Sequence, residues 1–439
     1  MRNRWQVWTA VTGALLLPAG VLALAQAARP SEDATIDYVK AQPANAITRL
    51  QQKLDSGQAK LSWDARHGYL PAVLNALGVP VSSQVLVFSK TSFQHPHISP
   101  KTPRALYFND HSYIGWVQGG DYVEVSTVDP RLGAVFYLLP QEPAPKPKFV
   151  RQTYECLQCH DGSMTKGVPG HIMRSVYARV DGQPDFRAGT YLTTDQSPME
   201  ERWGGWYVTG THGGQRHMGN VMSKNADYPD QIDRDAGANL TSLKGLLDTS
   251  PYLTPHSDLV ALMVLEHEVN VHNLITKAGY ETRIALEYER SLNKELGRGD
   301  GYRAESTMSR VKSACEPLVQ AMLFVKEAPL AGPFKGTSGF AEQFEKMGPK
   351  DSQGRSLRQL DLGTRMFRYP CSFLIYSEAF DALPPLAKEY VYRRLAEVLR
   401  GRDISPDFAH LTGADRKAIL DILTATKPDF ADYLAKTPA

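Results

Sequence analysis

The motif Cys156-Leu157-Gln158-Cys159-His160 constrains this chain more than any other feature of its sequence. Two thiols lie three positions apart, and a histidine follows the second thiol directly. This spacing is typical of sites where two cysteines form thioether bonds to a porphyrin and the histidine binds its iron. We therefore predict one covalent haem c, held by Cys156 and Cys159 with His160 as proximal ligand. The alternative is a chance Cys-x-x-Cys pair.

The first residues have the pattern of an export signal. Arg2 and Arg4 precede an apolar run over 7–24, and small residues suited to cleavage follow at 23–27. We expect residues 1–25 to be a signal peptide and the mature protein to be periplasmic, or otherwise exported from a bacterial cell. This agrees with haem c attachment, which takes place outside the cytoplasm. The alternative is an uncleaved membrane anchor, although glycines and a proline interrupt the run.

Length and charge limit the classes of protein and partner. A chain of 439 residues predicts two or three domains, and 42% hydrophobic with 22% charged residues is an ordinary globular composition. The formal net charge of +2 falls to about neutral once Arg2 and Arg4 are removed. We therefore expect no nucleic-acid partner, and no membrane span after signal cleavage because no later stretch approaches about 20 apolar residues.

Two cysteines lie outside the haem motif. Cys315 and Cys371 are an even number in an oxidising compartment, which makes a disulfide between them plausible. Two buried thiols are the equal alternative.

The N-terminal half has helical spacing first and strand spacing afterwards. Apolar residues over 45–54 and 69–77 predict two short helices, the second ended by Gly78-Val79-Pro80. Runs of β-branched and aromatic residues, separated by turn residues, then predict an antiparallel meander of about five strands. These runs are 85–88, 105–108, 113–117, 122–128 and 134–139.

A proline-rich stretch and a change of composition suggest the domain limits. Four prolines within 140–147 favour an extended linker, and the haem motif follows it. We predict an α+β protein with an N-terminal β-rich domain over 26–145, a haem module with long loops over 146–290, and a mainly helical region over 291–439. Helices are expected at 258–277, with Ser257 as N-cap and Gly279 as stop, and at 283–296, 385–399 and 414–424.

Cys156, Cys159 and His160, together with the order of elements after them, resemble the class I cytochromes c. In that family a methionine ligand follows the motif in a loop, and a helix closes the fold. The resemblance implies a cytochrome c-like module with Met218 as second axial ligand, in the glycine-rich stretch 213–220. Other candidates for that position are His217, Met222, His171 and His212. The runs 86–94 and 202–210 also look like segments of uncharacterised bacterial haem-containing proteins.

Other side chains near Met218 have possible haem contacts. Arg202 and Arg216 have the geometry to pair with propionates, since guanidinium binds carboxylate through two parallel bonds. Trp203, Trp206 and Tyr207 are candidates to pack on the porphyrin, with ordinary core packing as the alternative.

The predicted helix over 258–277 carries a dense polar group. Glu266, His267, Glu268 and His272 are candidate acid or base residues for peroxide cleavage, whereas hydrogen bonding to packed loops is the structural alternative. A zinc protease site is excluded by spacing, because His267 and His272 are five positions apart and do not share a helical face.

Three functions are consistent with this sequence. The first is electron transfer with an unknown redox partner by an exported monohaem protein, whose iron is bound by His160 and Met218. The second is a haem-dependent peroxidase or oxygenase type of oxidoreductase with an open sixth position, so whether the chain is an enzyme stays open. The third is a haem-based gas or redox sensor.

Overall fold

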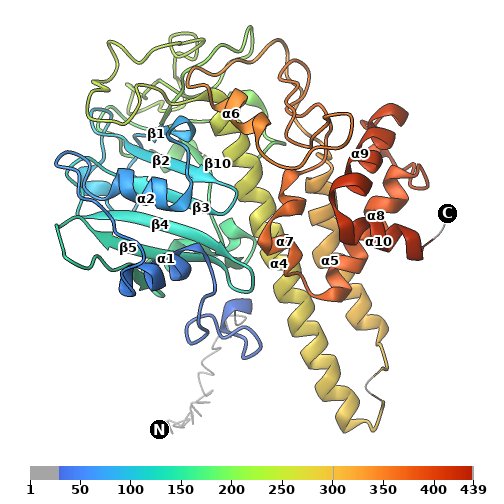
Figure 1. The fold of residues 1–439 in the computed structure, drawn as a ribbon. Helices are drawn as coiled ribbons and strands as arrows, with labels where there is room; N and C mark the ends of the chain where they lie inside the picture. Colours follow the sequence, from blue (N-terminus) through green and yellow to red (C-terminus); the bar gives the residue numbers. More distant parts are fainter. Residues whose placement is uncertain (1–28, 300, 438–439) are drawn as a thin grey trace, which may run out of the picture.

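The computed structural model describes residues 29–299 and 301–437. The predicted signal peptide, residues 1–25, lies outside the described residues. An antiparallel sheet occupies the N-terminal region and helices dominate the C-terminal region, which confirms a mixed α+β chain. Figure 1 shows the long helix α4 (Leu259–Glu295) between the sheet and the C-terminal helices.

The central sheet has seven strands in the order β11-β1-β2-β3-β4-β5-β6. Every neighbouring pair is antiparallel. The predicted five-stranded meander is confirmed within one or two residues at each end. Its strands are β1 (Val85–Val87), β2 (Arg104–Asn109), β3 (Ser112–Trp116), β4 (Tyr122–Asp129) and β5 (Gly133–Pro140).

The two edge strands come from the chain after the proline-rich stretch. β6 (Val150–Gln152) pairs with β5, and β11 (Trp206–Tyr207) pairs with β1. The sheet is therefore not confined to residues 26–145, because backbone pairing satisfies the edge hydrogen bonds of β1 and β5 with later segments.

Two short helices cover one face of the sheet. In α1 (Ala46–Asp55) the Asn45 side chain accepts hydrogen bonds from the amides of Ile47 and Thr48, and α2 (Leu70–Leu77) ends at Gly78 with φ of 63°. Both helices were predicted. Their apolar side chains share one core cluster with the residues of β1 to β5 that point to this face.

The opposite face of the sheet packs against the turn helix α3 (Leu157–His160) and α4. Small strands brace this layer: β7 (Asp161–Gly162) pairs with β8 (Val168–Pro169), and β9 (Arg174–Val176) pairs with β10 (Thr190–Leu192).

Helix α4 differs from the prediction in its N-cap residue and in where it ends. Asp258, not Ser257, is its N-cap and accepts bonds from the amides of Val260 and Ala261, while the Ser257 hydroxyl donates to the Tyr207 carbonyl. The helix also continues through Gly279, where a stop was predicted. The cost of one helical glycine is about 1 kcal/mol, which packing on both sides of a buried helix outweighs.

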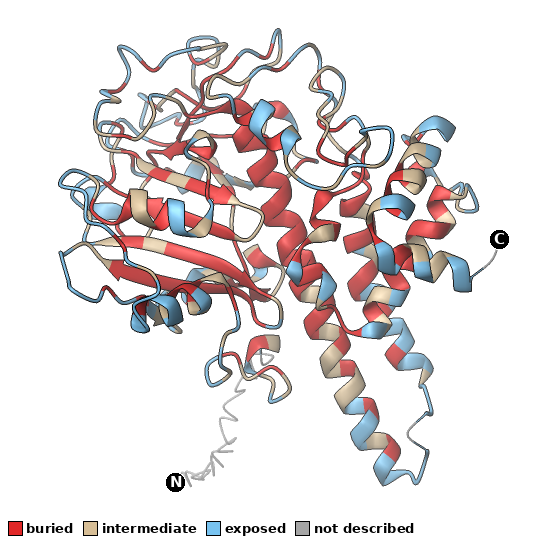
Figure 2. Ribbon diagram, viewed as in Figure 1, coloured by how far each residue is buried: buried red, intermediate tan, exposed pale blue. Residues whose placement is uncertain are grey.

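The C-terminal region packs on the far side of α4. Figure 2 shows α4 buried along the sheet and exposed toward its distal end, where it projects with α5. No helix in the described part of the chain is long and apolar enough to span a bilayer. The remaining helices are α5 (Glu305–Met322), α6 (Phe340–Lys346), α7 (Glu378–Asp381), α8 (Pro385–Leu399), α9 (Gly413–Thr426) and α10 (Pro428–Lys436).

Candidate functional site

The Cys-x-x-Cys-His motif forms a single helical turn, α3, at the inner face of the sheet. Its N-cap is Cys156, whose carbonyl accepts a hydrogen bond from the His160 amide at 2.9 Å. Leu157 is buried in the core and anchors the turn. Cys156 is half-buried, Cys159 is exposed, and both thiols are free. The turn therefore presents two unpaired thiols and one imidazole on a short rigid segment.

His160 is oriented by a reciprocal pair of hydrogen bonds with Gly170. The His160 ring places Nδ1 at 2.9 Å from the Gly170 carbonyl, and the Gly170 amide donates to the His160 carbonyl at 2.9 Å. Since a carbonyl only accepts, Nδ1 carries the proton and Nε2 is left with its lone pair. Burial lowers the pKa of His160, which keeps the ring neutral. A neutral imidazole that donates to a carbonyl through one nitrogen can bind a metal through the other.

Asn273 of α4 holds the segment directly after β8, which carries the Gly170 carbonyl. Its amide oxygen accepts from the His171 amide at 3.0 Å, and its amide nitrogen donates to the His171 carbonyl at 2.8 Å. A Cβ on Gly170 would lie 2.2 Å from the Asn273 side-chain oxygen, so only glycine fits there. The helix therefore fixes the position of the His160 acceptor.

Three sheet residues form a row beneath this turn. Register places Tyr113 opposite Ser126 and Ser126 opposite Phe136, so the three side chains share one face. The Phe136 ring lies 4.8 Å from the His160 ring, and the Ser126 hydroxyl lies 2.6 Å from Nε2 of His171. His171 is buried with its pKa well below the usual range because of burial.

The row continues to α4 through a buried phenol–imidazole hydrogen bond. The Tyr113 hydroxyl lies 2.7 Å from Nδ1 of His272, and the ring of Tyr113 lies 4.1 Å from that of His171. Burial raises the pKa of Tyr113 and lowers that of His272 to about 3. The phenol is therefore protonated and donates to a neutral imidazole.

The donor set of the turn fits haem c. Two free thiols one helical turn apart can form the thioether bonds, and His160 offers an unprotonated Nε2 with no hydrogen-bond partner among the described residues. Within 29–299 and 301–437, no three His, Cys, Asp or Glu side chains are arranged to hold a metal ion by themselves. A porphyrin supplies four ligands of its own, so one histidine suffices.

A half-buried ion pair near the turn was not identified from the sequence. Arg104 of β2 and Glu124 of β4 form a salt bridge on the same sheet face as the row. Both charges act on His160, Arg104 lowering and Glu124 raising its pKa after the larger effects of burial and the Gly170 bond. The available signal was Glu124, a charged residue within the predicted strand over 122–128.

Met218 is buried, and its sulfur lies 3.6 Å from the Ser175 hydroxyl. Its amide donates to the Arg202 carbonyl. Iron ligation by Met218 would require the sulfur to exchange this hydroxyl for the metal. Met222, the other candidate methionine, is half-buried and packs against the cluster beneath α1 and α2.

His212 and His217 form a buried pair of their own. Their rings lie 4.7 Å apart, with Nε2 of His212 accepting from the Asn239 amide and Nδ1 of His217 accepting from the Gly219 amide. Burial lowers the pKa of His217 to about 3. The second nitrogen of each ring is buried without a partner in the described chain.

The two candidate propionate arginines are already paired with carboxylates. Arg202 donates to Glu266 at 3.0 Å in a fully buried ion pair, and Arg216 donates to Asp235 at 2.5 Å. Neither guanidinium is placed against the Cys-His turn by a contact in the structure.

The three aromatic candidates have different partners in the structure. The Trp206 indole nitrogen donates to the Arg174 carbonyl, whereas the Tyr207 hydroxyl points to the opposite sheet face and donates to Pro100. Trp203 is buried beside His217, at a ring distance of 5.3 Å.

The four polar candidate residues of α4 have different surroundings. Nε2 of His267 lies 2.8 Å from the Ser372 hydroxyl, and its Nδ1 lies 3.7 Å from a carboxylate oxygen of Asp195. Burial raises the pKa of Glu266 to about 7 and raises that of Glu268 well above its usual range. Of the four candidates, only His272 contacts the row that leads to His160.

The other two cysteines are buried free thiols. Cys315 and Cys371 have no exposed surface, and burial raises the pKa of each to about 12. The structure therefore contains the second of the two predicted alternatives, without a disulfide.

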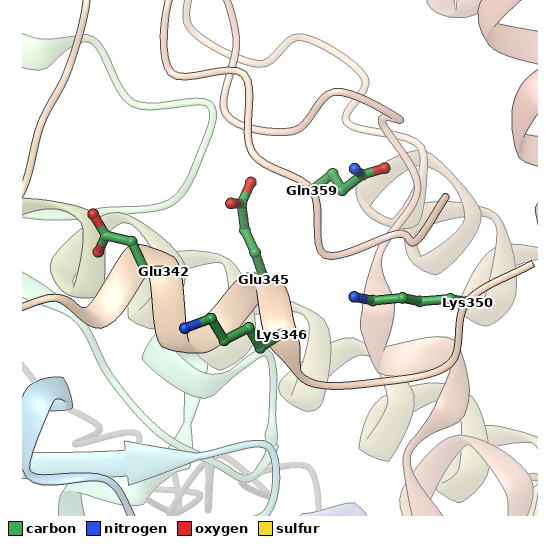
Figure 3. A pocket seen from close by; sticks show the side chains of 5 residues that line it. All are labelled: Glu342, Glu345, Lys346, Lys350 and Gln359. Carbon is green, nitrogen blue, oxygen red and sulfur yellow. The ribbon is translucent and has the colours of Figure 1, made fainter. Parts of the chain in front are cut away.

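A surface hollow of about 350 Å³ lies beside α6, away from the Cys-His turn. Figure 3 shows its charged and amide side chains, which come from α6 and the loops after it. No buried unpartnered polar atom belongs to these residues within the described chain. We assign no ligand to it. The lining residues are Glu342, Glu345, Lys346, Lys350 and Gln359.

Comparison of this chain with protein-family models, curated proteins and solved structures found no match.

Proposed function

We propose that this chain is an exported c-type haem protein that carries electrons, with one haem bonded to Cys156 and Cys159 and ligated by His160. The observation that carries the proposal is the bond from Nδ1 of His160 to the Gly170 carbonyl, beside two free thiols. That bond fixes the tautomer and the ring plane required of a proximal ligand. A cytochrome c-like haem module over 146–290 and a periplasmic location belong to the same proposal.

When bound, the haem supplies a one-electron couple at its iron. The residues of this chain set the environment of that couple. Burial keeps His160 neutral, Gly170 and Asn273 keep its ring correctly turned, and Phe136 packs against one side of the imidazole. The Arg104–Glu124 pair provides charges that tune the potential through the low-dielectric interior.

Met218 is the proposed second axial ligand. The test is the absorption spectrum of the oxidised and reduced protein, with and without carbon monoxide, compared between the natural chain and Met218→Leu. A methionine-to-iron charge-transfer band and no response to carbon monoxide in the natural chain, both reversed in Met218→Leu, support electron transfer with Met218 as ligand. Ser175→Ala is the control, because it removes the competing hydroxyl and leaves the sulfur in place.

One observation favours the second candidate function, a haem-dependent oxidoreductase of the peroxidase or oxygenase type. The Met218 sulfur contacts the Ser175 hydroxyl. In this arrangement it would not bind the iron, whose sixth coordination position would be open. A high-spin spectrum that shifts with carbon monoxide or peroxide, unchanged in Met218→Leu, would reject the carrier proposal in favour of this one.

A further inference from the structure

A continuous string of aromatic rings leads from the Cys-His turn to helix α4. Ring centres lie 4.8 Å apart from His160 to Phe136, 5.9 Å from Phe136 to His171, and 4.1 Å from His171 to Tyr113. Each step is within the range of direct ring contact. The string joins β5 and β3 of the sheet to His160 of α3 and to His171 in the loop after β8, and it ends on a phenol.

Tyr113 is hydrogen-bonded to an imidazole, whereas the buried Tyr390 and Tyr392 of the C-terminal region donate to carboxylates and other buried tyrosines donate to amide oxygens. The acceptor is Nδ1 of His272 at 2.7 Å, a neutral imidazole nitrogen, whereas Tyr107 donates to the side-chain oxygen of Gln84 and Tyr280 to the Leu132 carbonyl. An amide oxygen is a very weak base, while imidazole accepts a proton readily. Tyr113 therefore has a proton acceptor already in contact, on a path to the haem site.

The surroundings keep this pair neutral at rest. Tyr113 faces Asp110, whose negative charge opposes a phenolate, and the carboxyl group of Glu268, while His272 faces His111 and His267. Glu268 is buried and held protonated by that burial, and Asp110 is bound by Arg358. A phenolate and a charged phenol radical are both disfavoured here, so oxidation of Tyr113 removes the electron and the proton together.

We propose that Tyr113 and His272 are a proton-coupled redox pair, through which a peroxide-class oxidant reduced at the haem site draws electrons from the protein. This rests on the proposed haem attachment and on the open sixth position of the second candidate function. Tyr113 loses one electron and its O–H bond breaks, while the proton forms an N–H bond at Nδ1 of His272. Reduction of one hydrogen peroxide to two waters takes two electrons and two protons: Tyr113 supplies one electron, a one-electron reductant in solution supplies the other, and both protons come from solvent.

The test is electron paramagnetic resonance of the haem-loaded protein frozen within seconds of adding hydrogen peroxide. A tyrosyl radical is expected in the natural chain, absent in Tyr113→Phe and retained in Tyr107→Phe, a buried tyrosine on the opposite sheet face. His272→Gln should slow radical formation by about a hundredfold, the usual contribution of a positioned base. Circular dichroism confirms that each variant is folded.

Absence of a radical in haem-loaded natural protein, or an unchanged radical in Tyr113→Phe, would overturn the inference. Equal rates in His272→Gln and the natural chain would overturn the role of His272. Haem content is measured on the same samples, so a protein without covalent haem would reject the proposed function itself, whereas haem without a Tyr113 radical rejects only this pair.

Discussion

His160 and Gly170 exchange two hydrogen bonds, one through the backbone and one through the imidazole, each 2.9 Å long. The histidine that follows the two thiols is thereby fixed to the segment after β8, which α4 holds in place through Asn273. The orientation of the candidate iron ligand depends on a contact between segments far apart in sequence.

Gly170→Ala should destabilise the protein by about 2 kcal/mol, since the added Cβ would lie 2.2 Å from the Asn273 side-chain oxygen. The free energy of unfolding in urea measures this effect. Gly162→Ala is the matched control on the paired strand, because a Cβ there has no atom within 4 Å, and it should change stability by less than about 0.5 kcal/mol. Equal effects of the two variants would contradict the described packing.

The elements with regular periodicity could be predicted from the sequence, and the contacts of the site could not. Alternation identified β1 to β5, and the apolar repeat identified α1, α2 and α8. Gly279 gave the wrong end for α4 because a local propensity is weaker than burial on two sides. Composition gave no sign of β6 and β11, which are only three and two residues long.

Within the site, the motif alone identified Cys156, Cys159 and His160 as candidates. Gly170 and Asn273 have no distinctive pattern, because their role arises from close approach of a loop and a helix. The pairing of Tyr113 with His272 joins β3 to α4 across 159 positions. Strand alternation predicts which face Tyr113 occupies but not its partner.

The contribution of Glu327 to stability should fall as pH rises from about 5 to about 8. Burial raises the pKa of Glu327 from 4.5 to about 7, so the folded state holds a proton that the unfolded state releases between these values. Glu327→Gln keeps an acceptor for the Met366 amide and should reduce the fall by about 1–3 kcal/mol. Urea unfolding at both pH values measures it. The exposed Glu342→Gln should leave the profile unchanged, and an equally steep profile in Glu327→Gln would contradict the assignment.

Cys315 and Cys371 should resist thiol reagents in the folded protein, because both are buried and their pKa values are raised to about 12. After unfolding in urea without reductant, both should be labelled, as intact mass would show. Labelling that appears only after a reductant is added would indicate a disulfide between them.

The most direct measurement of the central claim is the haem content of the denatured protein. The chain is produced in a bacterial host that exports it and attaches haem c, then unfolded, extracted with acidified acetone and weighed by mass spectrometry. The account predicts one haem that stays with the natural chain and with Cys315→Ser, and none with the Cys156→Ser, Cys159→Ser double variant. A natural chain that carries no haem, or releases all of it on extraction, would contradict the account.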